Sequence, residues 1–103
     1  MAPRHIGAKE AQALASDGAV LVDIREPQEF MAETIPGATS KPLSELGHGP
    51  LGVAAERIIF YCKSGGRTRM AAAALAQSTD AETYIMDDGI EGWKAAGFPV
   101  KCG

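Results

Sequence analysis

One cysteine in the middle of the chain lies in a setting that favours reactive thiol chemistry. Cys62 follows an apolar run and precedes a short segment rich in glycine and cations, Lys63-Ser64-Gly65-Gly66-Arg67-Thr68. The two glycines can adopt positive φ angles, which lets successive backbone N–H groups turn inward and bind an anion. A helix predicted to begin at Thr68 adds the positive end of its dipole. Whole positive charges come from Lys63, Arg67 and Arg69.

Together these features would stabilise a thiolate. We therefore expect the pKa of Cys62 to lie below the value of about 8.5 for a free cysteine, and its sulfur to be nucleophilic near neutral pH. A cysteine that ends a strand without such neighbours would more simply be a small apolar packing residue. The glycines and cations favour the reactive thiol.

The spacing within the loop bears on the substrate. Cysteine phosphatases place their arginine after five intervening residues, Cys-x5-Arg, and so form a seven-membered loop around the phosphate. Here Arg67 closes a loop of six residues that starts at Cys62, and Thr68 stands at the seventh position. The shorter loop suits one added sulfur atom better than a phosphoryl group.

A thiol at such a point is positioned by the strand before it and the helix after it. Apolar blocks predict strands at 19–24, 57–62 and 83–86, with a possible edge strand at 99–100. Composition predicts helices at 8–16, 26–30, 68–77 and 91–96, and a short helix near 43–46 in a loop-like stretch from 39 to 56. Strands that alternate with helices indicate an α/β domain whose mostly parallel sheet has helices on both faces. In such a sheet reactive groups gather beyond the carboxyl ends of the strands, and Cys62 falls there.

The length and composition of the chain limit the classes of protein to which it can belong. The 103 residues suffice for one domain, expected to span 1–103, and 46% hydrophobic with 22% charged residues is typical of a globular domain. A net charge of -3 disfavours nucleic-acid binding, and no apolar run approaches the length of a membrane span. Cys62 and Cys102 show no disulfide or zinc spacing. We therefore expect a cytoplasmic protein without a structural metal site or a disulfide scaffold.

Four sequence blocks occur in a characteristic order. They are Val22 to Glu26 with Glu29-Phe30, Ile35 to Ala38, Cys62 to Arg67, and Gly89 to Trp93. This series resembles the rhodanese family of sulfurtransferases over essentially the whole chain. The resemblance implies a compact α/β domain with a five-stranded parallel sheet. It also implies that Cys62 is the nucleophile that becomes a persulfide, and that residues 63–68 donate backbone N–H groups to it, without a cofactor or metal.

The resemblance implies a sulfurtransferase with small-molecule substrates. Such an enzyme takes sulfane sulfur from a donor such as thiosulfate and passes it to a thiophilic acceptor, either cyanide or a thiol. An alternative with the same loop chemistry is a persulfide carrier that serves a protein acceptor. A cysteine phosphatase or arsenate reductase of the same architecture is a third hypothesis, against which the six-membered loop argues.

The chain departs from the family pattern at three places. Thr34 stands where rhodaneses often have a histidine, and Asp88-Gly89 replaces a Gly-Gly pair. Two-domain relatives that use thiosulfate carry an arginine at the position of Glu29 and a lysine at that of Ser64. Both cations hold thiosulfate in those relatives, so their replacement argues against thiosulfate as the natural donor.

Other polar and aromatic residues are expected to be structural. Asp23 and Arg25 end a strand, where a buried pair would hold the neighbouring loops in place. Trp93 is expected in the core. Cys102 is expected to be an exposed thiol on an edge strand remote from Cys62, without a role as its resolving cysteine.

Overall fold

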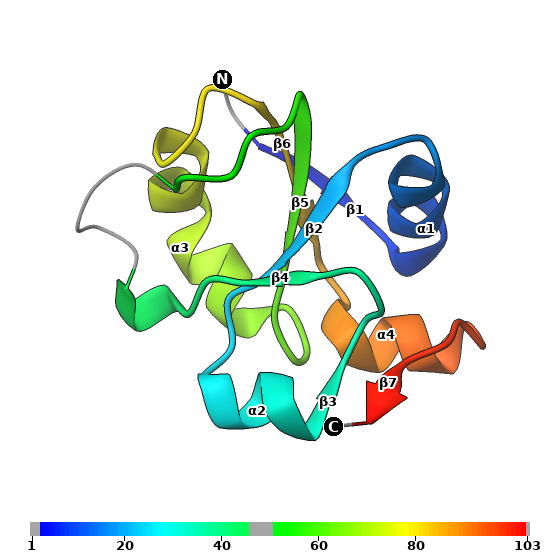
Figure 1. The fold of residues 1–103 in the computed structure, drawn as a ribbon. Helices are drawn as coiled ribbons and strands as arrows, with labels where there is room; N and C mark the ends of the chain where they lie inside the picture. Colours follow the sequence, from blue (N-terminus) through cyan, green and yellow to red (C-terminus); the bar gives the residue numbers. More distant parts are fainter. Residues whose placement is uncertain (1–2, 46–50, 103) are drawn as a thin grey trace.

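The computed structural model describes residues 3–45 and 51–102. Its centre is a five-stranded sheet in which all neighbouring strands are parallel, in the order β1-β6-β5-β2-β4 (Figure 1). The strands of this sheet are β1 (Arg4–Ile6), β2 (Val20–Asp23), β4 (Thr39–Ser40), β5 (Arg57–Tyr61) and β6 (Glu82–Met86). A second sheet pairs β3 (Glu33–Thr34) antiparallel with β7 (Lys101–Cys102).

Helices cover both faces of the five-stranded sheet (Figure 1). They are α1 (Ala8–Ser16), α2 (Pro27–Ala32), α3 (Gly66–Gln77) and α4 (Gly89–Ala95), with a short 3₁₀ helix at Leu43–Glu45. Side chains of α1 and α4 pack on one face and those of α3 on the other. Within the described ranges, no helix is long and apolar enough to cross a membrane.

The side chains of the middle strand β5 are buried under helices on both faces of the sheet. Ile59 and Tyr61 pack with α1 and α4, whereas Ile58 and Phe60 pack with α3. All four side chains are fully buried. A strand buried on both faces has a continuous apolar sequence instead of an alternating one. The predicted α/β fold with a five-stranded parallel sheet is therefore confirmed.

Several boundaries differ from the sequence prediction. The strands β1, β3 and β4 are not predicted, because two or three residues are too few to show an alternating pattern. The edge strand expected at 99–100 is instead at Lys101–Cys102, and it pairs with β3 outside the main sheet. The helix expected from Thr68 begins at Gly66, because Gly65 already adopts the left-handed conformation that precedes the helix. The short helix near 43–46 is present as Leu43–Glu45, and residue 46 lies outside the described residues.

Trp93 lies in the core, as predicted, with only 5% of its surface exposed. Its ring centroid is 5.0 Å from that of Phe98, and its Nε1–H donates a hydrogen bond of 2.7 Å to the carbonyl of Pro99. A buried indole needs such an acceptor for its single N–H group. The bond fastens the C-terminal segment to α4.

A buried ion pair anchors the end of β2. The guanidinium of Arg25 donates to the Asp23 carboxylate over 2.7–3.0 Å, and it also donates to the Glu33 carbonyl at 2.6 Å. The side chains of Asp23 and Arg25 are 0% and 5% exposed. Burial opposes the charge of Arg25, but hydrogen bonding and attraction to Asp23 outweigh it and raise the pKa of the guanidinium. These contacts tie the end of β2 to β3.

Replacing Asp23 by Asn should therefore destabilise the fold strongly. The Asp23→Asn variant leaves the Arg25 guanidinium buried without its counter-charge, a loss that typically costs about 3–5 kcal/mol. Asp17→Asn is the matched control, because Asp17 is 80% exposed in its ion pair with Arg57. The control should lose less than about 1 kcal/mol. Chemical denaturation measures both, and equal small losses would contradict the assignment.

Candidate active site

Cys62 lies directly after β5, at the carboxyl end of the sheet. The residue is 1% exposed and is enclosed by the loop that joins β5 to α3. Because β5 lies between β2 and β6, segments that follow these two strands border the loop on either side. The site therefore forms where a parallel sheet of this kind is expected to carry its reactive groups.

Backbone N–H groups at the start of α3 converge on the sulfur. The Gly65 N–H donates to Cys62 Sγ over 3.1 Å, and the backbone N–H groups of Arg67 and Thr68 also favour the charged form of the sulfur. These donors are free because the first N–H groups of a helix have no acceptor within the helix. The Thr68 hydroxyl lies 3.7 Å from Sγ and 3.0 Å from the Gly65 carbonyl oxygen.

These donors decide the ionisation of Cys62. Burial by itself raises the pKa of the thiol, because a charged sulfur is costly in a medium of low dielectric constant. The backbone and hydroxyl donors of Thr68, together with the N–H groups of Gly65 and Arg67, outweigh burial. The pKa of Cys62 consequently lies below its ordinary value.

Gly65 lets the loop approach the neighbouring strand end. Its φ of 94° lies in the left-handed region, and a Cβ here would overlap the carbonyl oxygen of Asp87, which follows β6. The side chain of Arg69 donates to that same carbonyl at 3.0 Å. A glycine is thus required at position 65 both by its conformation and by the available space.

Gly89, at the start of α4, allows a second close approach of this segment to the loop. Its φ is 61°, and a Cβ here would collide with the carbonyl groups of Cys62 and Lys63. Those two carbonyls accept hydrogen bonds of 2.9 and 3.0 Å from the N–H groups of Ile90 and Glu91. The first turn of α4 therefore holds the backbone of the cysteine loop.

Arg67 is held by a carboxylate from α2. Its Nη1 and Nη2 donate to the two carboxylate oxygens of Glu29 at 2.8 and 3.0 Å. Glu29 also accepts the Glu26 N–H at 3.2 Å, in the capping box that begins α2. The hydrogen bonds from Arg67 lower the pKa of Glu29 to about 2. The pair therefore contributes to stability above about pH 4.5, and this contribution is lost as the pH falls toward about 2.

The structure corrects how the cations act. The sequence suggests that Lys63, Arg67 and Arg69 place positive charge beside the thiolate. In the structure, Glu29 balances the charge of Arg67, and the Arg69 side chain donates to the Asp87 carbonyl. The side chains of Lys63 and Ser64 are exposed, and Gly66 is the first residue of α3. Backbone and hydroxyl donors, more than whole charges, therefore lower the pKa of Cys62.

Two supporting contacts are not evident from the sequence. Glu26 and Glu29 have the spacing of a capping box, but no local pattern indicates that Glu29 reaches Arg67, 38 positions away. Thr34 Oγ1 lies 3.1 Å from the Tyr61 hydroxyl, and both side chains are buried. A hydroxyl pair thus stands at the position where rhodaneses often have a histidine.

A cleft of about 230 Å³ adjoins the cysteine loop. Its charged lining residues are Arg25, Glu29, Glu33, Lys63, Glu91 and Lys94. Cys102 pairs with Glu33, so its edge strand lies at this end of the molecule and is not remote from the loop as expected.

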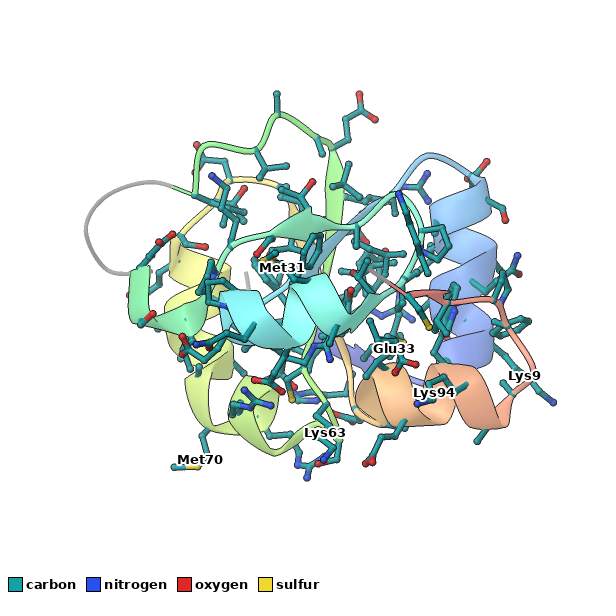
Figure 2. The ribbon with its side chains drawn as sticks, turned by 60° about the horizontal axis from the view of Figure 1, so that its bottom comes forward. Lys9, Met31, Glu33, Lys63, Met70 and Lys94 are labelled. Carbon is teal, nitrogen blue, oxygen red and sulfur yellow. The ribbon has the colours of Figure 1, made fainter. Side chains whose placement is uncertain are left out.

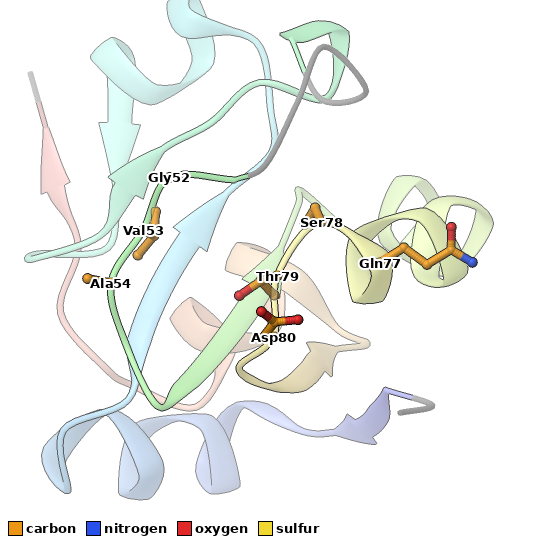
Figure 3. Close-up of a pocket in the computed structure, with 7 residues that line it drawn as sticks. All are labelled: Gly52, Val53, Ala54, Gln77, Ser78, Thr79 and Asp80. Atoms are coloured by element: carbon orange, nitrogen blue, oxygen red, sulfur yellow. The ribbon is translucent and has the colours of Figure 1, made fainter.

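A larger cavity of about 600 Å³ lies between the segments 52–54 and 77–80, at the opposite end of the sheet (Figure 3). Because Lys63 of the cysteine loop lines the smaller cleft and no residue of that loop lines the larger cavity, the smaller cleft is the candidate substrate site.

Comparison with known proteins identifies the family of the chain. Residues 7–96 match the family model of the rhodanese-like domain. The chain is 37% identical over 100 residues to the thiosulfate sulfurtransferase GlpE of Ectopseudomonas mendocina, covering 93% of this chain and 88% of that protein. It is 36% identical over 85 residues to the uncharacterized protein slr1261 of Synechocystis, covering 82% of this chain and 48% of the relative. The chain thus spans about half the length of this second relative.

A solved structure gives the same result. The rhodanese-related protein of Thermoplasma volcanium aligns with a TM-score of 0.81 and 25% sequence identity, covering 95% of this chain and 97% of that one. The parallel sheet and these similarities place the chain in the α/β class of proteins with the rhodanese fold. Within that class, it belongs to the rhodanese-like domain family. The resemblance noted from the four sequence blocks is confirmed.

The packing at Gly65 predicts a difference between two glycine variants. Gly97 also has a left-handed φ, of 86°, but a Cβ there meets open space. Gly97→Ala should therefore lose about 1–2 kcal/mol of unfolding free energy. Gly65→Ala should lose more, about 3 kcal/mol or above, because the Asp87 backbone must also move. Chemical denaturation measures both, and similar losses would mean that the loop is not packed against Asp87.

The donor arrangement predicts how alkylation of Cys62 depends on pH. The thiolate is the reactive form, so the rate rises with pH through the pKa, with a midpoint below about 8.5. Thr68→Val removes the hydroxyl beside Sγ and should raise that midpoint. Thr79→Val, at the opposite end of the sheet, should leave it unchanged. A midpoint at or above 8.5 in the unaltered protein would refute this account of the loop.

Proposed function

We propose that this chain is a sulfurtransferase that carries sulfane sulfur as a persulfide on Cys62. The observation that supports this most directly is the buried thiol at the point where the N–H groups of Gly65, Arg67 and Thr68 converge. Such a site favours a sulfur anion without a metal or an external base. The thiolate would be nucleophilic near neutral pH.

The reaction has two transfers. The Cys62 thiolate attacks the outer sulfur of the donor, the S–S bond of the donor breaks, and the leaving group departs with the electron pair. That leaving group is sulfite from thiosulfate, or a thiolate from a persulfide. The acceptor, cyanide or a thiol, then attacks the outer sulfur of the Cys62 persulfide and regenerates the thiolate. The loop from Lys63 to Thr68 stabilises the negative sulfur in both steps through its N–H groups.

The charges around the loop bear on the donor. Thiosulfate is a dianion, whereas the guanidinium of Arg67 is already balanced by Glu29, whose carboxylate lies at the same rim. Relatives named thiosulfate sulfurtransferase support the transfer chemistry. In this chain, however, the ion pair favours a less negative donor. Asp23 and Arg25 support the site by holding the adjoining segments in place.

A carrier that serves a protein acceptor would use the same persulfide. The exposed Lys63 and Ser64 side chains at the rim are compatible with contact to another protein as well as with small substrates. Turnover distinguishes the two functions, because a carrier would load readily but release sulfur slowly to cyanide and to small thiols.

Intact mass spectrometry tests the proposal directly. After exposure to a sulfane donor, the protein should gain the mass of one sulfur atom and should lose it again on addition of a thiol. Cys62→Ser should abolish this gain, and Cys102→Ser, which removes the exposed cysteine, should retain it. Sulfur found on Cys102 by peptide analysis would refute the assignment. Hydrolysis of aryl phosphates faster than sulfur transfer would support the cysteine phosphatase instead.

A further inference from the structure

The cleft beside the cysteine loop has an unusual balance of charge. Three of its six charged lining residues are cations and three are carboxylates. Most of them are neutralised within ion pairs, namely Arg25 with Asp23, Glu29 with Arg67, and Lys94 with Glu33 at 2.8 Å. Figure 2 shows Glu33 and Lys94 side by side, with Lys63 on the same side of the molecule. The charges left for a ligand are one positive and one negative.

Those two charges belong to Lys63 and Glu91. Neither side chain has an ion-pair partner among residues 3–45 and 51–102, and both are exposed. Their backbones are joined by the hydrogen bond from the Glu91 N–H to the Lys63 carbonyl, 3.0 Å long. Lys63 directly follows Cys62, so one of these two unpaired charges is adjacent to the thiol in the sequence. A ligand that satisfies both must itself carry a cation and an anion.

We propose that this cleft binds the α-amino-acid end of a small thiol or persulfide. Glu91 binds the ammonium group and Lys63 binds the carboxylate, so that the sulfur is presented to Cys62. This inference rests on the sulfurtransferase function proposed above and names the class of its small substrate. The cleft volume of about 230 Å³ leaves room for the eight non-hydrogen atoms of cysteine persulfide. Thiosulfate has no cationic group to offer Glu91.

The transfer step from such a donor is balanced. The Cys62 thiolate attacks the outer sulfur of the amino-acid persulfide, and a new S–S bond forms on Cys62 Sγ. The S–S bond of the donor breaks, and the inner sulfur leaves as the amino-acid thiolate with the electron pair. The proton of the donor stays on the transferred sulfur, and no external oxidant or reductant is needed.

Truncated donors test the proposal. Loading of Cys62 is compared for cysteine persulfide, cysteamine persulfide, which lacks the carboxylate, and 3-mercaptopropionate persulfide, which lacks the ammonium group. Each truncated donor should show a kcat/KM about fivefold lower, the most that an exposed ion pair usually contributes. Glu91→Gln should remove the preference for the ammonium group, and Lys63→Gln should remove that for the carboxylate.

Matched controls lie on α1, away from the cleft. Lys9, which is labelled in Figure 2, and Glu10 are also exposed, and the Lys9→Gln and Glu10→Gln variants should keep both preferences. Equal kcat/KM values for the three donors would overturn the cleft proposal and leave the sulfurtransferase function intact. Failure of every donor, thiosulfate included, to load Cys62 would overturn both.

A binding measurement separates recognition from transfer. S-methylcysteine has the amino-acid end but no transferable sulfur, and it should shift the amide NMR signals of Lys63 and Glu91 in the Cys62→Ser protein. 3-(Methylthio)propionate, which lacks the ammonium group, should shift them about fivefold more weakly at equal concentration. Equal shifts from both compounds, or shifts from neither, would refute the assignment even if a variant failed to fold.

Discussion

A buried sulfur anion must be surrounded by hydrogen-bond donors, and the structure around Cys62 follows from this requirement. Burial alone raises the pKa of the thiol, whereas the donors of Gly65, Arg67 and Thr68 lower it. These N–H groups reach the sulfur only because α3 begins two residues earlier than its composition indicates, with Gly65 in the left-handed region. The conformation of one glycine thus places a helix terminus where the charge is stabilised.

The same requirement extends to the neighbouring strands. The loop carbonyls of Cys62 and Lys63 accept the first N–H groups of α4, so the segment after β6 supports the loop from one side. From the other side, Glu29 fixes the Arg67 side chain and so links α2 to α3. The buried pair of Asp23 and Arg25 ties the end of β2 to β3. Because a parallel sheet aligns the ends of its strands, these three supports act at one place.

The ion pairs that order the site also set the net charge of the cleft, and this net charge affects which substrates the cleft attracts. The contacts that hold the site together also neutralise most of its charges, because Arg67 is paired with Glu29 and Lys94 with Glu33. A cleft that is neutral overall offers little attraction to a dianion. The proposed preference for a small zwitterionic thiol is therefore a consequence of the same ion pairs that order the site.

The sequence by itself determined the α/β class, the strands around 20–23 and 57–61, and the position of Cys62 before a glycine-rich, cationic loop. These features depend on local composition and periodicity, which a short stretch of residues contains. Only the tertiary structure decided where α3 begins, which short segments pair as strands, and that Glu29 neutralises Arg67. The physical reason is that such contacts join residues tens of positions apart. Their formation depends on how the ends of packed strands and helices meet in space, which no local pattern records.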